Sequence, residues 1–265
     1  MSLLRTFSTL GCPAFTLDAA LALAARYGLG GVELRALGGT VELPRYLALE
    51  YGSPAALADK MRGSPVRIVS LDTSLHVIGA TKEEREQLDE FVPWAEALGV
   101  RWLRVFDGGK SANDAELAEA ADVFGRWRER RRQHGWAVDW MVETHDSLFT
   151  SGAIASFVRA VPGVAILWDS HHTWKKGGED PVATWQAIHG HVVHVHVKDS
   201  ISLPSGRHPF TYVLPGQGEF PAQPLFSRLR EGFTGPVSLE WELLWHPTLA
   251  PLEEALQVAQ ENAWW

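Results

Sequence analysis

The stretch VVHVHVKDS, residues 192–200, carries two opposite chemical characters on alternating positions. In a β-strand, residues two positions apart point to the same face. Read as a strand, this stretch places valines 193, 195 and 197 on one face and His194, His196 and Lys198 on the other. The pattern predicts a strand whose apolar back packs against helices and whose polar front faces a functional site.

Strands and helices alternate along the whole chain around this stretch. Short β-rich runs lie at 4–8, 31–35, 66–71, 101–106, 136–143, 164–169, 191–198 and 236–242. Helical apolar periodicity of 3.6 residues begins near residue 16 and recurs near 53–62, 81–98, 114–133, 151–160, 180–189, 221–231 and 248–261. Eight such units in 265 residues predict one (β/α)8 TIM barrel domain over residues 1–265. The competing doubly wound sheet lacks its Gly-rich dinucleotide fingerprint after the first strand.

The clearest predicted helix runs from Thr81 to about Leu98. Thr81 and Glu84 fit a capping box at its start, and Gly99 fits the stop signal at its end. Pro93 lies inside this helix and lacks a backbone donor, so we expect it to kink or split the helix.

The composition narrows the classes of partner and compartment. The net charge of −8 argues against a nucleic-acid backbone as partner, and we interpret the basic run at 126–134 as a solvated helix face. No apolar run approaches the ~20 residues that a membrane span needs, and the first residues lack the apolar core of a signal peptide. With one cysteine, Cys12, no internal disulfide can form. We therefore expect a cytoplasmic protein without a membrane or nucleic-acid partner.

Four late strands carry a polar residue opposite their apolar stripe, close to the strand end. These residues are Glu143 in AVDWMVETH, Asp169 in VAILWDSHH, His196 in VVHVHVKDS and Glu240 in VSLEWE. In a barrel such side chains converge at one mouth, where bare carboxylates would repel one another and pay a desolvation cost. A divalent cation offsets that charge and accepts oxygen and imidazole ligands together. The set therefore predicts one metal site, suited to Mn²⁺, Mg²⁺ or Co²⁺, with Zn²⁺ as a further candidate.

Six motifs together resemble the xylose-isomerase-like superfamily of TIM barrels. They are GVELR at 31–35, VETH at 142–145, WDSHH at 168–172, HVHVKDS at 194–200, PGQGEF at 215–220 and GPVSLEWE at 235–242. This group includes sugar isomerases and epimerases, inosose isomerases and dehydratases, and DNA-repair enzymes of the endonuclease IV type. The resemblance implies that Glu143, Asp169, His196 and Glu240 are the metal ligands. It also implies that His172, three residues after Asp169, contacts substrate.

The resemblance further implies a proton-transfer reaction. Glu143 and Glu240 match the glutamates that act as the acid/base pair of the epimerase branch, through an enediolate. We expect a metal-dependent isomerase or epimerase acting on a small sugar, ketose or inosose. The alternative is a dehydratase, a lyase that acts on a related keto-polyol or dehydroshikimate-like acid at the same site.

Two other functions are disfavoured. An endonuclease IV-like DNA-repair enzyme would need an Asp-x-His pair after the seventh strand, but the loop ISLPSGRHPF holds His208 with no Asp two residues earlier. A barrel that binds a ligand without catalysis is disfavoured by the intact glutamate pair.

Further residues at the predicted mouth are candidates for substrate contact. Glu33 and Arg35 share the inward face of their strand, where they either contact substrate or form a structural ion pair. His76 is either a substrate contact or an ordinary loop histidine. Lys198 lies at the rim, and Arg207 lies on a loop that could cover the site. The predicted substrate-binding residues are thus His172, Lys198, Arg207, Glu33 and His76.

Two remaining features have mainly structural interpretations. His194 lies ~6–7 Å deeper than His196 at the usual strand rise, so we expect it to be a hydrogen-bonded core histidine. The terminal Trp264 and Trp265 are an exposed apolar end unless something covers them. A neighbouring subunit in a homodimer is one way to cover them.

Overall fold

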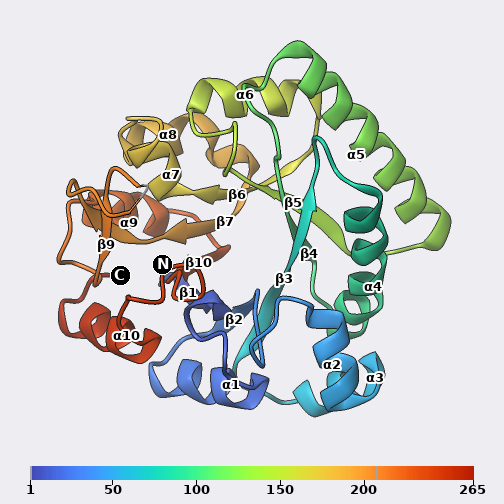
Figure 1. The fold of residues 1–265 in the computed structure, drawn as a ribbon, viewed down its shortest axis with the longest axis horizontal. Coiled ribbons are helices and arrows are strands. Elements are labelled where there is room, and N and C mark those ends of the chain that lie inside the picture. Colours follow the sequence, from blue (N-terminus) through green and yellow to red (C-terminus); the bar gives the residue numbers. More distant parts are fainter. Residues whose placement is uncertain (1, 207) are drawn as a thin grey trace.

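Eight parallel strands close into a barrel in the computed structural model, which describes residues 2–206 and 208–265. Their order around the barrel is β1-β10-β7-β6-β5-β4-β3-β2, so the last strand closes against the first (Figure 1). The strands are β1 (Leu4–Ser8), β2 (Gly31–Leu34), β3 (Arg67–His76), β4 (Trp102–Phe106), β5 (Asp139–Glu143), β6 (Ala165–Asp169), β7 (Val192–Val197) and β10 (Pro236–Leu239). The predicted single-domain (β/α)8 barrel is confirmed.

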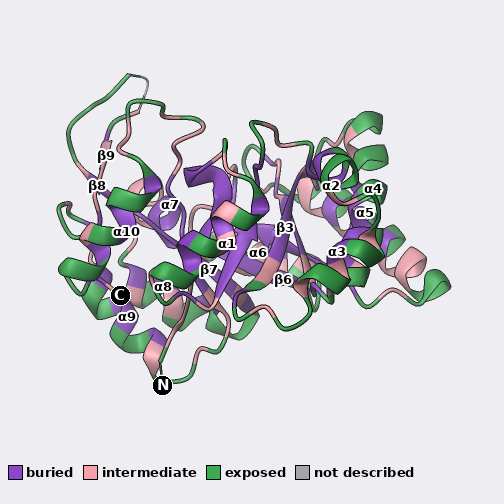
Figure 2. Ribbon diagram, turned by 90° about the horizontal axis from the view of Figure 1, so that it is seen from below, coloured by how far each residue is buried: buried purple, intermediate pink, exposed green. Residues whose placement is uncertain are grey.

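Helices form the outer layer of the barrel. They are α1 (Leu17–Arg26), α2 (Leu43–Tyr51), α3 (Pro54–Met61), α4 (Lys82–Leu98), α5 (Asp114–His134), α6 (Ser151–Ala160), α7 (Ser170–Lys175), α8 (Pro181–Ile188), α9 (Ala222–Arg230) and α10 (Leu252–Glu261). Figure 2 shows buried strands at the centre and helices whose outer faces are exposed. The apolar strand residues, such as Val195, Val197 and Trp168, pack into the main core against these helices.

Helix α4 confirms the predicted caps, and of the two effects expected of Pro93, splitting of the helix does not occur. The Thr81 hydroxyl accepts from the Glu84 amide, the Glu84 side chain accepts from the Thr81 amide, and Gly99 ends the helix in the left-handed conformation. Pro93, however, does not split it: α4 runs unbroken to Leu98. The apolar face that buries Leu88, Phe91, Val92 and Ala95 holds the helix against the barrel and outweighs one missing hydrogen bond.

Several elements differ from the predicted pattern. Strand β3 continues to His76 through an irregular pairing with β4, whereas the pattern predicted an end at residue 71. The short helices α2 and α7 were not predicted. Nor was the antiparallel hairpin of β8 (Asp199–Ile201) and β9 (Thr211–Val213), which follows β7 directly. This hairpin is fixed by Asp199, whose carboxylate accepts from the amides of Gly216, Gly218 and Phe220.

The barrel interior changes character along its axis. A small apolar cluster of Met141, Ala165 and Leu167 fills part of it. Other inward side chains are polar and bond to one another: Ser238 contacts Thr6 at 2.6 Å and His194 at 2.7 Å. These inward polar side chains need hydrogen-bond partners because burying a polar group without one costs folding free energy.

The end of the chain folds back on the barrel. The Trp264 ring packs at 84° against Phe226 of α9, and only 3% of Trp264 is exposed. The Gln223 side-chain amide donates to the carbonyls of Ala263 and Trp264. Trp264 is therefore covered by its own chain and needs no second subunit for its burial.

Among the described residues, no helix has the length and apolar character required to span a membrane.

Candidate metal centre and reaction cavity

Four side chains from four neighbouring strand ends converge at the mouth of the barrel. They are Glu143 at the end of β5, Asp169 at the end of β6, His196 in β7 and Glu240 just after β10. One ligand atom from each lies within 4.8 Å of those of the other three, and all four residues are buried. The structure thus brings together the whole set predicted as metal ligands.

Some of the ligand atoms in this cluster make no hydrogen bonds. Within the described chain, Nδ1 of His196 and Oε2 of Glu143 are buried and make none. Nδ1 lies 3.7 Å from Oε1 of Glu143 and 3.3 Å from Oε2 of Glu240. Unsatisfied buried acceptors arranged in this way fit a divalent cation, which takes carboxylate oxygens and imidazole nitrogen as ligands.

The charged groups of the cluster shift one another's pKa values. Burial raises the pKa of Asp169 to about 6, and Glu240 and Glu143 add to that rise while Lys198 opposes it. Burial and Glu240 would also raise the pKa of Glu143, but Arg104 and His196 outweigh both and hold it below its usual value. Glu143 is therefore ionised at neutral pH and able to accept a proton.

Glu33 of β2 lies beneath this cluster rather than in the open mouth. The side chain is fully buried, and its carboxylate accepts from Nε2 of His196 at 2.9 Å. Burial would raise the pKa of Glu33, but the effects of His196 and His194 outweigh that of burial and hold the pKa of Glu33 well below its usual value. Because Nε2 of His196 donates to Glu33, Nδ1 is the nitrogen left to face the cluster. The geometry is that of the structural ion pair, with Glu33 orienting His196.

His194 lies deeper in the same strand, where its Nε2 is 2.9 Å from Glu33 and 2.7 Å from the Ser238 hydroxyl. It is a buried, hydrogen-bonded histidine, as the strand pattern predicted.

Lys198 is buried between acids rather than exposed at the rim. Its Nζ lies 2.8 Å from Asp169 and 2.6 Å from Glu242, and it also pairs with Glu240. Burial would lower the pKa of Lys198, but these three carboxylates outweigh it and raise the pKa well above its usual value. Lys198 is a permanent cation at the edge of the cluster.

His172 is placed by the cap of α7. The Asp169 carboxylate accepts from the His172 amide at 2.9 Å, so one residue both caps the helix and joins the cluster. Burial, followed by the charges of Lys198 and Lys176, lowers the pKa of His172 well below its usual value. Its Nδ1 donates to the Thr144 carbonyl at 3.1 Å, which leaves the other ring nitrogen as an acceptor.

A cavity of about 300 Å³ opens over the cluster at the barrel mouth. Glu143, Glu240 and His172 line it, and so does His76, whose Nδ1 contacts Glu84 at 2.8 Å and whose ring stacks on Phe106. Of the predicted substrate-binding residues, His76 and His172 line the cavity, while Glu33 and Lys198 lie behind it. Arg207 lies outside the described residues.

Two arginines line this cavity: Arg35, which strand parity placed at the mouth together with Glu33, and Arg104, which was not among the predicted site residues. Arg35 follows β2 and Arg104 belongs to β4, and both are buried in the cavity wall. The strand pattern held a signal for Arg104: it alternates with the outward-facing Leu103 and Val105, so its charge had to point inward.

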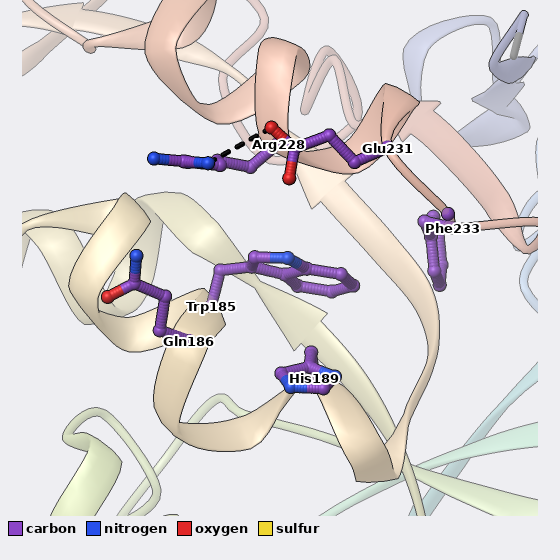
Figure 3. A pocket seen from close by; sticks show the side chains of 7 residues that line it. Trp185, Gln186, His189, Arg228, Glu231 and Phe233 are labelled. Carbon is purple, nitrogen blue, oxygen red and sulfur yellow. Dashed lines mark hydrogen bonds and ion pairs between the residues drawn. The ribbon is translucent and has the colours of Figure 1, made fainter.

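A larger cavity of about 430 Å³ lies outside the barrel, between α8 and α9 (Figure 3). Trp185 and His189 lie on one side and the Arg228–Glu231 ion pair on the other. Both clusters of metal-ligating side chains found among the described residues lie inside the barrel and not at this outer cavity.

A family model described as xylose isomerase-like TIM barrel matches residues 21–262. The chain belongs to this family. The match covers every strand of the barrel except β1 and all four residues of the cluster. The search of curated proteins found no match to this chain.

Solved structures share this xylose isomerase-like fold at low sequence identity. A probable 3-DHS dehydratase, AsbF, involved in petrobactin synthesis in Bacillus anthracis, superposes with a TM-score of 0.78 at 19% identity, over 98% of this chain and 99% of that one. The IOLI protein, solved with a bound zinc atom, superposes with a TM-score of 0.75 at 20% sequence identity, over 98% of this chain and 96% of that one. A D-tagatose 3-epimerase-like protein superposes with a TM-score of 0.64 at 14% sequence identity, over 98% of this chain and 100% of that one. These likenesses show a common fold.

Proposed function

We propose that this protein is a divalent-metal-dependent isomerase or epimerase that acts on a small sugar, ketose or inosose by proton transfer. The observation that carries the proposal is that Glu143 and Glu240 belong to a four-ligand cluster and also line the cavity above it. The proposal is consistent with the family and with the zinc in the IOLI protein.

The residues present would hold the ion through Glu143, Asp169, His196 and Glu240. This oxygen-rich set suits Mn²⁺, Mg²⁺ or Co²⁺, with Zn²⁺ as a further candidate. When bound, such an ion would polarise a substrate carbonyl and acidify the neighbouring C–H.

The chain itself would move the proton. Glu143, ionised at neutral pH, would accept the proton from the substrate carbon, and Glu240 would exchange a proton at the opposite side of the reacting centre. Glu33 holds the His196 ring in place, and His172 offers a neutral acceptor to a substrate hydroxyl. Lys198 pairs with Glu240 and favours its charged form, which prepares it for proton exchange.

The test combines metal dependence with the two glutamates. A panel of ketoses, inososes and dehydroshikimate-like acids is assayed with Mn²⁺, after chelation, and after Mn²⁺ is restored. We expect Glu143→Gln and Glu240→Gln each to lower turnover by about 10²- to 10⁴-fold. The matched control is Glu231→Gln, in the outer ion pair of Figure 3, which should retain full activity. Unchanged turnover in both cluster variants, or full activity after chelation, would overturn the proposal.

A dehydratase acting on a related keto-polyol or dehydroshikimate-like acid is the second candidate. It is favoured by Lys198, a buried cation beside Glu240 whose positive charge would stabilise a departing hydroxide. The likeness to the probable 3-DHS dehydratase over nearly the whole chain is consistent with it. Product mass separates the two, because an isomerase conserves substrate mass and a dehydratase product has lost one water.

A further inference from the structure

Lys198 is among the largest fully buried side chains of the protein, and only 1% of it is exposed. Its Nζ lies 2.8 Å from Asp169 and 2.6 Å from Glu242, and it also pairs with Glu240. These three acids form a carboxylate cage around the ammonium. Asp169 and Glu240 also belong to the four-ligand cluster, whereas Glu242 lies outside it. The carboxylate cage and the cluster therefore adjoin and share two carboxylates.

The carboxylate cage holds more negative charge than one lysine requires. Glu242 alone would neutralise the ammonium, yet Nζ also reaches Asp169 and Glu240. Tyr212 of β9 covers the cage: its hydroxyl donates to Glu242 at 2.8 Å, and its ring centre lies 5.7 Å from Nζ. Carboxylates and an aromatic ring face both attract a cation, and carboxylates buried without one are costly. The surroundings of Nζ are thus those of a cation-binding place.

The oxygens of the carboxylate cage also suit a divalent ion, because Mn²⁺ and Mg²⁺ take carboxylates as ligands. Glu240 lies between the cage and the cluster: its Oε2 is 3.3 Å from Nδ1 of His196 and pairs with Lys198. A carboxylate has several lone pairs, so one placed between two ions can bind both. Among the described residues, the clusters of closely spaced metal-ligating atoms leave out Glu242. The cage is therefore not vacant, since the ammonium fills it.

We propose that Lys198 occupies the place of a second cation, so that the centre holds a single divalent ion and the carboxylate cage is a latent second metal site. The inference rests on the proposed function for the first ion, at the four-ligand cluster. Paired metal ions in phosphatases and nucleases clamp the attacking and leaving oxygens of a phosphate ester. A fixed ammonium beside one ion supplies positive charge without an open coordination position, which suits proton transfer and disfavours such hydrolysis.

The test counts Mn²⁺ ions per chain in the wild type and in Lys198→Ala. Chelator-treated protein is titrated with Mn²⁺ by calorimetry, and the bound ions are examined by electron paramagnetic resonance. We expect one bound ion in the wild type and two in Lys198→Ala, because the alanine leaves the carboxylate cage open. Since Glu240 would be shared by the two ions, the variant should show the spectrum of a spin-coupled pair and the wild type that of an isolated ion.

Further variants and an added amine locate the second ion. Lys198→Ala combined with Glu242→Gln should bind one ion, because the cage has lost a ligand that the cluster does not use. Lys198→Met, which fills the same space without charge, should also bind one. Propylammonium, at about ten times its own Kd, should weaken the second ion's binding to Lys198→Ala by about 10-fold, because it returns an ammonium to the cage. Lys60→Ala, which breaks an exposed ion pair with Asp18, is the matched control and should bind as the wild type does.

Three results would overturn the proposal. They are two ions in the wild type, no additional ion in a folded Lys198→Ala, and a second ion that survives Glu242→Gln or is indifferent to propylammonium. Circular dichroism identifies any variant that fails to fold. Lys198→Asn then carries the test, because asparagine is shorter than lysine and offers a carbonyl oxygen as a ligand, so this variant should also bind two ions.

The same titrations separate this inference from the proposed function. One ion in the wild type and one in Lys198→Ala supports the metal function and overturns the role of Lys198. No ion in the wild type and one, displaced by propylammonium, in Lys198→Ala overturns the metal function and supports the role of Lys198. No ion in either protein overturns both.

Discussion

At the scale of single residues, the two ring nitrogens of His196 face different carboxylates. Nε2 donates to Glu33, and Nδ1 faces Glu143 and Glu240. Carboxylates that bond to the far nitrogen of a metal-ligating histidine fix its orientation and raise its basicity. Under the proposed function, Glu33 acts on the metal through His196 rather than on the substrate.

We expect Glu33→Gln to weaken Mn²⁺ binding by about 10- to 100-fold while the barrel stays folded. Mn²⁺ titration followed by calorimetry measures the change, and circular dichroism checks the fold. Glu42→Gln, an exposed carboxylate that makes no cap bond at the start of α2, is the control. Wild-type affinity in the Glu33 variant would show that His196 needs no such support.

Cys12 offers a second prediction at this scale. Its side chain is buried, and burial raises the pKa of the thiol to about 12. Because the thiolate is the reactive form, the folded protein should resist thiol reagents at pH 8. We expect slow labelling by Ellman's reagent under native conditions and rapid labelling of one thiol in guanidinium chloride. Fast native labelling would contradict the burial of Cys12.

The residue scale also shows where sequence reasoning ended. The alternation of side chains along the strand correctly predicted that Glu33 points into the barrel. Alternation does not tell how deep along the barrel axis a side chain lies. The depth of Glu33 depends on the pairing of β2 with β3, where the register shifts between Val32 and Glu33. The four cluster residues were easier to predict because each lies at or near a strand end, and strand ends meet at one level.

At the scale of elements, α4 is tied to the cavity wall through its first turn. Glu84 completes the capping box with Thr81 and also contacts His76. We expect Thr81→Ala to destabilise the protein by about 1 kcal/mol, because the Glu84 amide loses its acceptor. Chemical denaturation measures the loss, and Thr81→Ser should show little of it. Equal stability of the alanine variant would mean that the cap contributes nothing.

The loop after β8 gives an element-scale prediction of pH dependence. Glu219 accepts from the Ser202 hydroxyl and amide and pairs with Lys175, and these contacts lower its pKa to about 2. Because the pKa of Glu219 is lower in the folded protein than its ordinary value of 4.5, its ionised carboxylate stabilises the fold at any pH above about 4.5. This stabilisation is lost as the pH falls from 4.5 toward 2.

We therefore expect Glu219→Gln to lower the melting temperature at pH 7 and the difference from wild type to shrink between about pH 4.5 and pH 2. Circular dichroism melts over this range measure it. Ser202→Ala, which removes one donor, should reproduce part of the effect. A difference that is constant with pH would contradict the linkage to this carboxylate.

Short elements were the hardest to predict for a physical reason. Helix α7 and the β8–β9 hairpin are too short to show a clear apolar period, and Glu42, which precedes α2, makes no side-chain cap bond. Tertiary contacts hold them instead: Asp169 caps α7, and Asp199 accepts several amides of the loop after β9. The long helices and central strands were predictable because each buries a continuous apolar face.

At the scale of the whole molecule, the end of the chain completes the core. We expect Trp264→Ala to destabilise the protein by about 3–5 kcal/mol, because Trp264 fills space against Phe226 of its own chain. Trp265→Ala, at a more exposed position, should cost less. Denaturation curves measure both losses, and size-exclusion chromatography reads the oligomeric state of each variant. If instead Trp264→Ala alters the oligomeric state without loss of monomer stability, the tryptophan acts between subunits.

The closure of β1 against β10 has a consequence for how the protein is made. The Thr6–Ser238 hydrogen bond joins residues 232 positions apart, and Glu240, a ligand of the cluster, lies just beyond it. During translation, the ribosome must release the chain at least through β10 before the ring can close. The four-ligand centre cannot assemble earlier, so a truncated or stalled product would have no complete site for a cation. Under the proposed function, the cell would therefore load metal onto the four-ligand site only after the barrel has closed.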